Sequence, residues 1–139
     1  MPDHLKARCL CRGIAFGIQA PIITCSHCHC DSCRRAHSAA FVTWSSFRKD
    51  QVSLSKGAEL LRRFESSSGV FRSFCGVCGS PLIYESESEG DIVYLPTACF
   101  ESSIGSEPVR HVSVEEKAPW LVIGDHLPRY QGKDQLVSE

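Results

Sequence analysis

Hydrophobic and polar positions in this chain alternate over short stretches and do not follow the helical period of 3.6 residues. Residues 8–18 predict two short strands around a tight turn at 12–13, with Ile14, Phe16 and Ile18 on one face. Further β-branched and aromatic runs, each bounded by turn residues, predict strands at 41–44, 51–55, 60–65, 70–74, 82–84, 91–95 and 109–114. This pattern predicts a mainly β fold in which most strands pair antiparallel.

A helical pattern is confined to residues 31–37, about two turns, for which Asp31 is the predicted N-cap. The chain contains no internal repeat and no linker-like segment. We therefore expect one compact antiparallel β domain over residues 1–139, with short hairpins and at most one or two short helices.

Charge and composition narrow the function classes. Fifteen Lys and Arg residues against sixteen Asp and Glu give a net charge of −1, which argues against a general nucleic-acid binder. No run approaches the roughly 18 apolar residues of a membrane-spanning helix, so no membrane partner is expected. The first residues carry no apolar leader, which predicts a cytoplasmic location where thiols stay reduced.

Cysteine is the unusual component of the chain, with nine residues in 139. An odd number rules out complete pairing as disulfides within one chain, and reduced clustered thiols indicate metal binding, with zinc the first candidate. The C-x-C pair Cys9 and Cys11 and the C-x-x-C pair Cys75 and Cys78 together supply four thiolates. Glycines beside the second pair are typical of a zinc knuckle. The four cysteines therefore predict a closed structural zinc site.

A second cluster, Cys28, Cys30 and Cys33, supplies three thiolates and predicts a zinc site with an open position. Cys25 offers an alternative, because Cys25, Cys28, Cys30 and Cys33 could hold one local zinc ion. Four ligands within nine residues demand a tightly curved backbone, and no glycine lies between Cys25 and Cys33 to permit it. The open three-cysteine site is therefore favoured. His27 alternates with these cysteines along an extended segment, as does His29, and both are expected to point to the opposite face.

Several of these segments occur in the order and spacing of a known family. They are Cys9-Leu10-Cys11, Cys28-His29-Cys30-Asp31-Ser32-Cys33-Arg34, Phe74-Cys75-Gly76-Val77-Cys78-Gly79-Ser80, His111-Val112, Ala118-Pro119-Trp120 and Asp125-His126-Leu127-Pro128. Together they resemble the glutathione-dependent formaldehyde-activating enzyme family, which includes centromere protein V. The resemblance runs from about residue 8 to residue 130.

The resemblance implies a zinc-stapled β fold, shared with a small GTPase-binding chaperone family. It implies a structural zinc at Cys9, Cys11, Cys75 and Cys78. It also implies a second zinc at Cys28, Cys30 and Cys33, tied to the condensation of glutathione with formaldehyde into S-hydroxymethylglutathione. The expected activity is thus that of a zinc-dependent carbon–sulfur lyase, similar to S-(hydroxymethyl)glutathione synthase.

A three-thiolate zinc is poorly suited to making hydroxide and well suited to holding a substrate thiol as thiolate. A small thiol, glutathione being the expected one, is therefore predicted to complete the second site. Arg34 and Arg35 follow Cys33 directly and are candidates for binding the carboxylates of that thiol. Cys99 is a further candidate at the substrate site or as a fourth ligand, although it also fits the pattern of a small buried hydrophobic residue.

An alternative function is a non-catalytic zinc-binding module that acts in protein–protein interaction. Both zinc ions would then be structural. The property that separates the two functions is an exchangeable ligand position at the second zinc.

Overall fold

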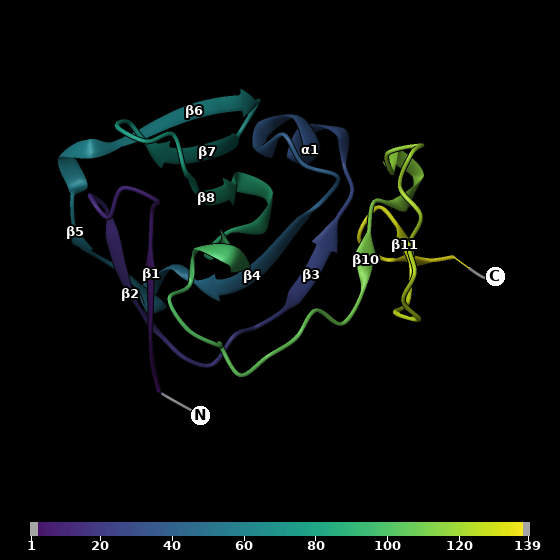
Figure 1. The fold of residues 1–139 in the computed structure, drawn as a ribbon, viewed down its shortest axis with the longest axis horizontal. Coiled ribbons are helices and arrows are strands. Elements are labelled where there is room, and N and C mark those ends of the chain that lie inside the picture. The colour runs from purple at the N-terminus through teal and green to yellow at the C-terminus, as the bar shows by residue number, and fades with distance from the viewer. Residues whose placement is uncertain (1–2, 138–139) are drawn as a thin grey trace.

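The computed structural model describes residues 3–137, whose strands form three sheets (Figure 1). The small sheet has the order β1-β2-β5 and the large sheet the order β10-β3-β4-β9-β8-β7-β6. The third sheet pairs β11 with β12 near the C-terminus. The mainly β fold expected from the sequence is confirmed.

The strands of the small sheet are β1 (His4–Arg8), β2 (Ala15–Gln19) and β5 (Val52–Lys56). Those of the large sheet are β3 (Cys25–Cys28), β4 (Val42–Arg48), β6 (Leu61–Ser67), β7 (Val70–Cys75), β8 (Pro81–Ser86), β9 (Ile92–Pro96) and β10 (His111–Val112). The last pair is β11 (Tyr130–Gln131) and β12 (Gln135–Leu136). Single 3-10 turns occupy η1 (Lys49–Gln51), η2 (Ala58–Leu60), η3 (Glu87–Glu89), η4 (Thr97–Cys99) and η5 (Val114–Glu116).

β1 and β2 form the predicted first hairpin, but the connection between them is longer than the two-residue turn expected from the alternation. β1 begins at His4, and the connection to β2 takes residues 9–14. Ile14, Phe16 and Ile18 are all buried on one face, as predicted. The longer connection is what leaves Cys9 and Cys11 in a turn and not inside a strand.

Several strand assignments differ from the sequence expectation, including β11 and β12, which were not predicted. The stretch predicted over 109–114 shortens to the two residues of β10, because the backbone enters a left-handed turn at Ser113 (φ 57°). β3 was not predicted as a strand, since its sequence Cys-Ser-His-Cys carries no β-branched or aromatic residue. β3 pairs antiparallel with β4 and parallel with β10.

The α-helix of the described chain, α1 (Asp31–His37), has the predicted bounds. Its N-cap is Cys30 and not Asp31, because the Cys30 sulfur accepts a hydrogen bond from the Cys33 backbone N–H at 3.3 Å. Asp31 is instead the first helical residue. A candidate metal ligand therefore also fixes the start of the helix.

The main core lies where the small sheet packs on the large one. Leu5, Phe16 and Ile18 from the small sheet meet Phe47 and Leu95 from the large sheet, all almost fully buried. Burying such side chains provides most of the favourable free energy of folding. A smaller cluster of Cys33, Val42 and Trp44 lies beside α1. None of the helices formed by residues 3–137 combines the length and the apolar character needed to cross a membrane.

Candidate metal centres and adjoining cavities

Four cysteine sulfurs converge where the small and large sheets meet. Cys9 and Cys11 lie in the turn between β1 and β2, while Cys75 ends β7 and Cys78 lies in the turn to β8. All four sulfurs lie within 4.8 Å of one another. The Cys9 and Cys11 sulfurs are 3.6 Å apart, and those of Cys11 and Cys75 are 3.8 Å apart.

These separations fit a tetrahedral metal ion. With zinc–sulfur bonds of about 2.3 Å, two ligands of a tetrahedron lie about 3.8 Å apart. Backbone N–H groups also point at the sulfurs: that of Ile14 donates to Cys9 at 3.3 Å, and that of Val77 donates to Cys75 at 3.4 Å. Such donors stabilise thiolates and are typical of metal-bound cysteines.

The pKa values of two of these cysteines also indicate a metal site. The Ser80 hydroxyl favours the thiolate of Cys78 and lowers its pKa to about 5. At Cys11 the Gly13 N–H acts to lower the pKa, but the neighbouring sulfurs, led by Cys9, raise it to about 11. Four thiolates in such close contact repel one another unless a cation lies among them, so this donor set suits a divalent metal.

The turn that carries Cys75 and Cys78 depends on glycine. Gly79 has φ +79°, a left-handed conformation that other residues adopt at a cost, and its N–H donates to the Cys75 carbonyl at 2.8 Å. A side chain at Gly76 would come within 2.9 Å of the Leu60 carbonyl oxygen. The glycines of this segment thus permit the tight turn that brings its two cysteines together.

Cys28, Cys30 and Cys33 form a second group, whose three sulfurs lie within 4.8 Å of one another. Cys28 ends β3, Cys30 caps α1, and Cys33 lies in the first turn of α1. The chain turns from β3 into α1 at this place, and the turn brings the three cysteine sulfurs together. The donor set is that of a three-thiolate site.

A cation from a distant strand contacts this group. Both terminal nitrogens of Arg72, in β7, lie near the Cys33 sulfur, at 3.7 and 3.8 Å. Hydrogen bonds from Cys28 and Cys30, together with the charge of Arg72, lower the pKa of Cys33 to about 2. Cys33 is therefore the member of the group best stabilised as a thiolate.

The three sulfurs line a cavity of about 220 Å³. Its walls carry three aromatic residues, Trp44, Tyr84 and Tyr94, and three cationic residues, Arg72, Arg110 and Lys133. The cations come from β7, from the segment before β10 and from the turn between β11 and β12. Small cavities with an apolar wall and a few charged groups are typical ligand sites.

The predicted thiol-binding arginines lie elsewhere. Arg34 donates to the His29 carbonyl at 3.4 Å and pairs with Asp31, and Arg35 pairs with the same carboxylate at 2.8 Å. Neither side chain is among those lining the three-sulfur cavity. Cys25 also lies apart, with its sulfur 3.7 Å from the hydroxyls of Ser45 and Thr97.

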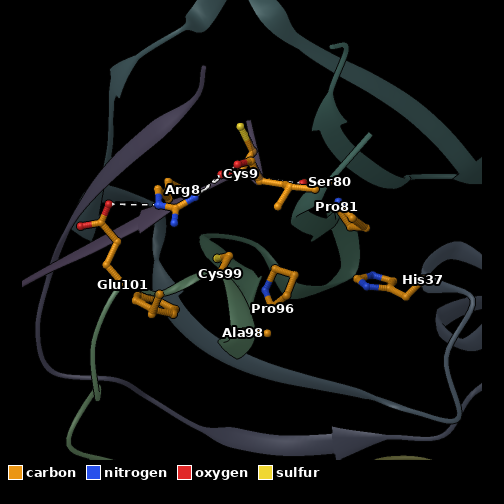
Figure 2. A pocket seen from close by; sticks show the side chains of 11 residues that line it. Arg8, Cys9, His37, Ser80, Pro81, Pro96, Ala98, Cys99 and Glu101 are labelled. Carbon is orange, nitrogen blue, oxygen red and sulfur yellow. Dashed lines mark hydrogen bonds and ion pairs between the residues drawn. The ribbon is translucent and has the colours of Figure 1, made fainter. Parts of the chain in front are cut away.

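Cys99 lines a separate cavity of about 450 Å³ (Figure 2). Arg8 and Glu101 form an ion pair at 3.5 Å on one side of this cavity, and His37 lies on the other. Burial raises the pKa of the Cys99 thiol to about 12, so the thiol is neutral and a weak nucleophile. The structure does not bring Cys99 to the three-sulfur group.

Sequence reasoning missed the cavity residues Arg72, Arg110, Lys133 and Tyr84. In β7, Arg72 shares one face with the apolar residues Val70 and Phe74, and an arginine on such a face is a signal that could have found it. Arg110 and Lys133 carry no such signal. They reach the cavity through long-range packing, in which the Arg110 guanidinium donates to the Lys133 carbonyl at 2.9 Å.

The chain is similar to known proteins in both sequence and fold. Residues 4–116 match the family described as glutathione-dependent formaldehyde-activating enzyme. An uncharacterized lyase of the yeast Schizosaccharomyces pombe is 35% identical over 86 residues, which is 60% of this chain and 58% of that relative. The match therefore spans less than two thirds of the relative.

A Rhodobacter sphaeroides protein of known crystal structure has the same fold, with a TM-score of 0.61 and 20% identity. The superposition covers 74% of this chain and 97% of the other. The family match covers most of the chain and includes all the cysteines of both sulfur groups. The chain belongs to the glutathione-dependent formaldehyde-activating enzyme family.

Proposed function

We propose that this protein is a carbon–sulfur lyase that joins a small thiol, glutathione or a close relative, to formaldehyde or a related small aldehyde. Family membership and the lyase named among its relatives support the reaction class. The observation that carries the proposal is a cavity that combines three clustered cysteine sulfurs with three cationic side chains. The cavity would thus provide one site for the sulfur of the substrate thiol and another for its carboxylates.

The two sulfur groups would have different roles. Cys9, Cys11, Cys75 and Cys78 would hold a structural zinc ion, because they provide a complete set of four thiolates. Cys28, Cys30 and Cys33 would hold a second zinc ion beside the cavity. When bound there, zinc supplies an open coordination position that lowers the pKa of a substrate thiol and holds it as thiolate.

The cationic wall would select and orient the thiol. Glutathione carries two carboxylates, and the guanidinium groups of Arg72 and Arg110 can bind carboxylates through paired hydrogen bonds. Lys133 adds a third positive charge, partly offset by its ion pair with Glu89 at 2.6 Å. A thiol without carboxylates would lack these contacts and should bind more weakly.

The reaction forms one carbon–sulfur bond. The thiolate sulfur adds to the aldehyde carbon, the carbonyl double bond becomes a carbon–oxygen single bond, and the thiol proton ends on that oxygen. The side chain of Tyr84 lines the cavity. Burial raises the pKa of Tyr84, so the hydroxyl stays protonated and can donate to the developing oxyanion.

The proposal is tested by measuring adduct formation directly. Carbon-13 exchange spectroscopy of labelled formaldehyde with glutathione separates the catalysed exchange rate from the spontaneous one. We expect zinc-loaded protein to raise this rate and Cys28→Ser to return it to the spontaneous value. Cys99→Ser is the matched control, since it removes a thiol from the other cavity and should leave the rate unchanged.

A second pair of variants tests thiol recognition. Losing one charge-assisted hydrogen bond costs roughly 1.5 kcal/mol or more, so Arg110→Ala should raise the half-saturating glutathione concentration about tenfold. Arg35→Ala should leave it unchanged, because Arg35 pairs with Asp31 outside the cavity. If zinc-loaded protein neither binds glutathione nor exceeds the spontaneous rate, the proposal is wrong and a non-catalytic interaction module becomes the better reading.

A further inference from the structure

A cluster of metal-binding side chains lies on the face of β3 opposite Cys28. Ser26 and Cys28 face the cavity, while His27 points to the other side, as the alternation predicted. In the parallel pairing of β3 with β10, His27 is the direct partner of His111. The two rings therefore lie side by side, with centroids 4.8 Å apart.

Asp125 brings a carboxylate to this pair from the loop between η5 and β11. Its two oxygens lie 3.0 and 3.1 Å from the His111 Nε2 atom, and one of them also accepts the Leu127 N–H at 3.0 Å. One donor atom from each of His27, His111 and Asp125 falls within 4.8 Å of the other two. Three separate segments of the chain thus converge on one point.

Both histidines are held by their second nitrogen. The Nδ1 atom of His27 is 2.8 Å from the Thr43 hydroxyl, and the Nδ1 atom of His111 is 2.7 Å from the Nε2 atom of His29. Metal-binding histidines almost always use the nitrogen that is not coordinated in such a hydrogen bond, which fixes the ring and its tautomer. The Leu127 N–H orients the carboxylate in the same way.

We propose that His27, His111 and Asp125 form a third metal site, which binds a divalent transition-metal ion such as zinc, cobalt or nickel. Two imidazoles and one carboxylate suit these borderline ions better than magnesium or calcium, which prefer oxygen ligands alone. His111 is buried, whereas the Asp125 side chain is 44% exposed. Solvent therefore reaches the site, and water completes the coordination of the ion.

The site differs from the two cysteine groups in chemistry and in position. It contains no sulfur, and its ligand His27 lies on the opposite face of β3 from Cys28. Thiolates bind zinc more strongly than this neutral pair of imidazoles and one carboxylate, so the third site should fill only after the cysteine groups. Its occupancy is expected to vary with the available metal.

Metal counting by native mass spectrometry tests the proposal. Protein whose cysteine groups already hold zinc is titrated with cobalt, and we expect one additional ion in wild type. Asp125→Ala should lose that ion and keep the zinc. His126→Ala is the matched control, because it removes an exposed neighbouring histidine outside the cluster and should keep the additional ion.

Visible absorption of the same samples gives an independent readout. Cobalt at a nitrogen and oxygen site shows weak visible bands without the intense sulfur-to-metal absorption of a cysteine site. The proposal is overturned if wild type takes up no additional ion, if Asp125→Ala takes it up equally well, or if the added cobalt shows sulfur-to-metal absorption. In those cases His111 and Asp125 are a hydrogen-bonded pair only.

Discussion

Replacing Cys11 with alanine separates metal binding from packing at the four-sulfur group. Cys11 is exposed in the turn between β1 and β2, so packing alone predicts a change in stability within about 0.5 kcal/mol. If its sulfur is one of four zinc ligands, the expected loss is much larger. Structural zinc sites contribute about 10 to 16 kcal/mol, and one ligand in four accounts for about 3 kcal/mol of that.

Urea unfolding of zinc-loaded protein measures this difference. Cys11→Ala should lower the free energy of unfolding by about 3 kcal/mol, equivalent to roughly 10 °C in melting temperature. Leu10→Ala is the matched control, because Leu10 is 79% exposed in the same turn and should change stability by less than about 0.5 kcal/mol.

Unfolding in the presence of a metal chelator provides the decisive comparison. The chelator should strongly lower the stability of wild type and remove most of the stability difference between wild type and Cys11→Ala. The reasoning fails if Cys11→Ala is as stable as wild type with zinc present. It also fails if the variant shows the same deficit in chelator, because that deficit would then come from the turn itself.

Three further predictions concern the scaffold. Phe47→Ala should lower the free energy of unfolding in urea by about 4 kcal/mol, because Phe47 is fully buried between the sheets. Phe64→Ala is the control, since Phe64 is 62% exposed and its loss should lower that free energy by less than about 0.5 kcal/mol. Burial lowers the pKa of His37 to about 4 from its ordinary 6.5, so the unfolded state binds more protons between these values. The free energy of unfolding should therefore fall as the pH drops from about 6.5 to about 4, and it should fall less steeply in His37→Gln than in wild type. Parallel profiles of unfolding free energy against pH in the two proteins would contradict this. Ser38 ends α1 in the left-handed conformation, with φ 50°, which glycine adopts more easily than serine. Ser38→Gly should therefore raise the melting temperature by an amount equivalent to about 0.5 kcal/mol. An unchanged or lower melting temperature would argue against backbone strain at Ser38.

Local sequence signals predicted those parts of the fold that depend on neighbouring residues. The bounds of α1 followed from a polar start and two turns of helical pattern, and the burial of Ile14, Phe16 and Ile18 followed from alternation. The spacing of the cysteines also predicted which of them would converge, because a metal site leaves pairs and triplets at short range in the sequence. The ligands themselves remain a prediction until metal is measured.

Features that depend on long-range packing could not be predicted in this way. β3 exists because its backbone pairs with β4 and β10, and its own sequence has low strand propensity. The cavity cations Arg72, Arg110 and Lys133 are far apart in the chain and meet only after folding. Arg34 and Arg35 were favoured by their closeness to Cys33, but in the helix both side chains turn to the carboxylate of Asp31.

His27 and Cys28 are adjacent in β3 and face opposite sides of the sheet, so the register of this strand decides where both donor atoms lie. A slip of one residue against β4 would turn every side chain of β3 to the other face. In an ordinary strand that error exchanges apolar for polar groups. In β3 it would also move the Cys28 sulfur away from Cys30 and Cys33 and the His27 imidazole away from His111, so both donor sets would be lost at once. A mispaired chain could therefore keep much of its backbone structure and still have lost its chemistry, which makes metal content a more sensitive test of correct folding than secondary structure.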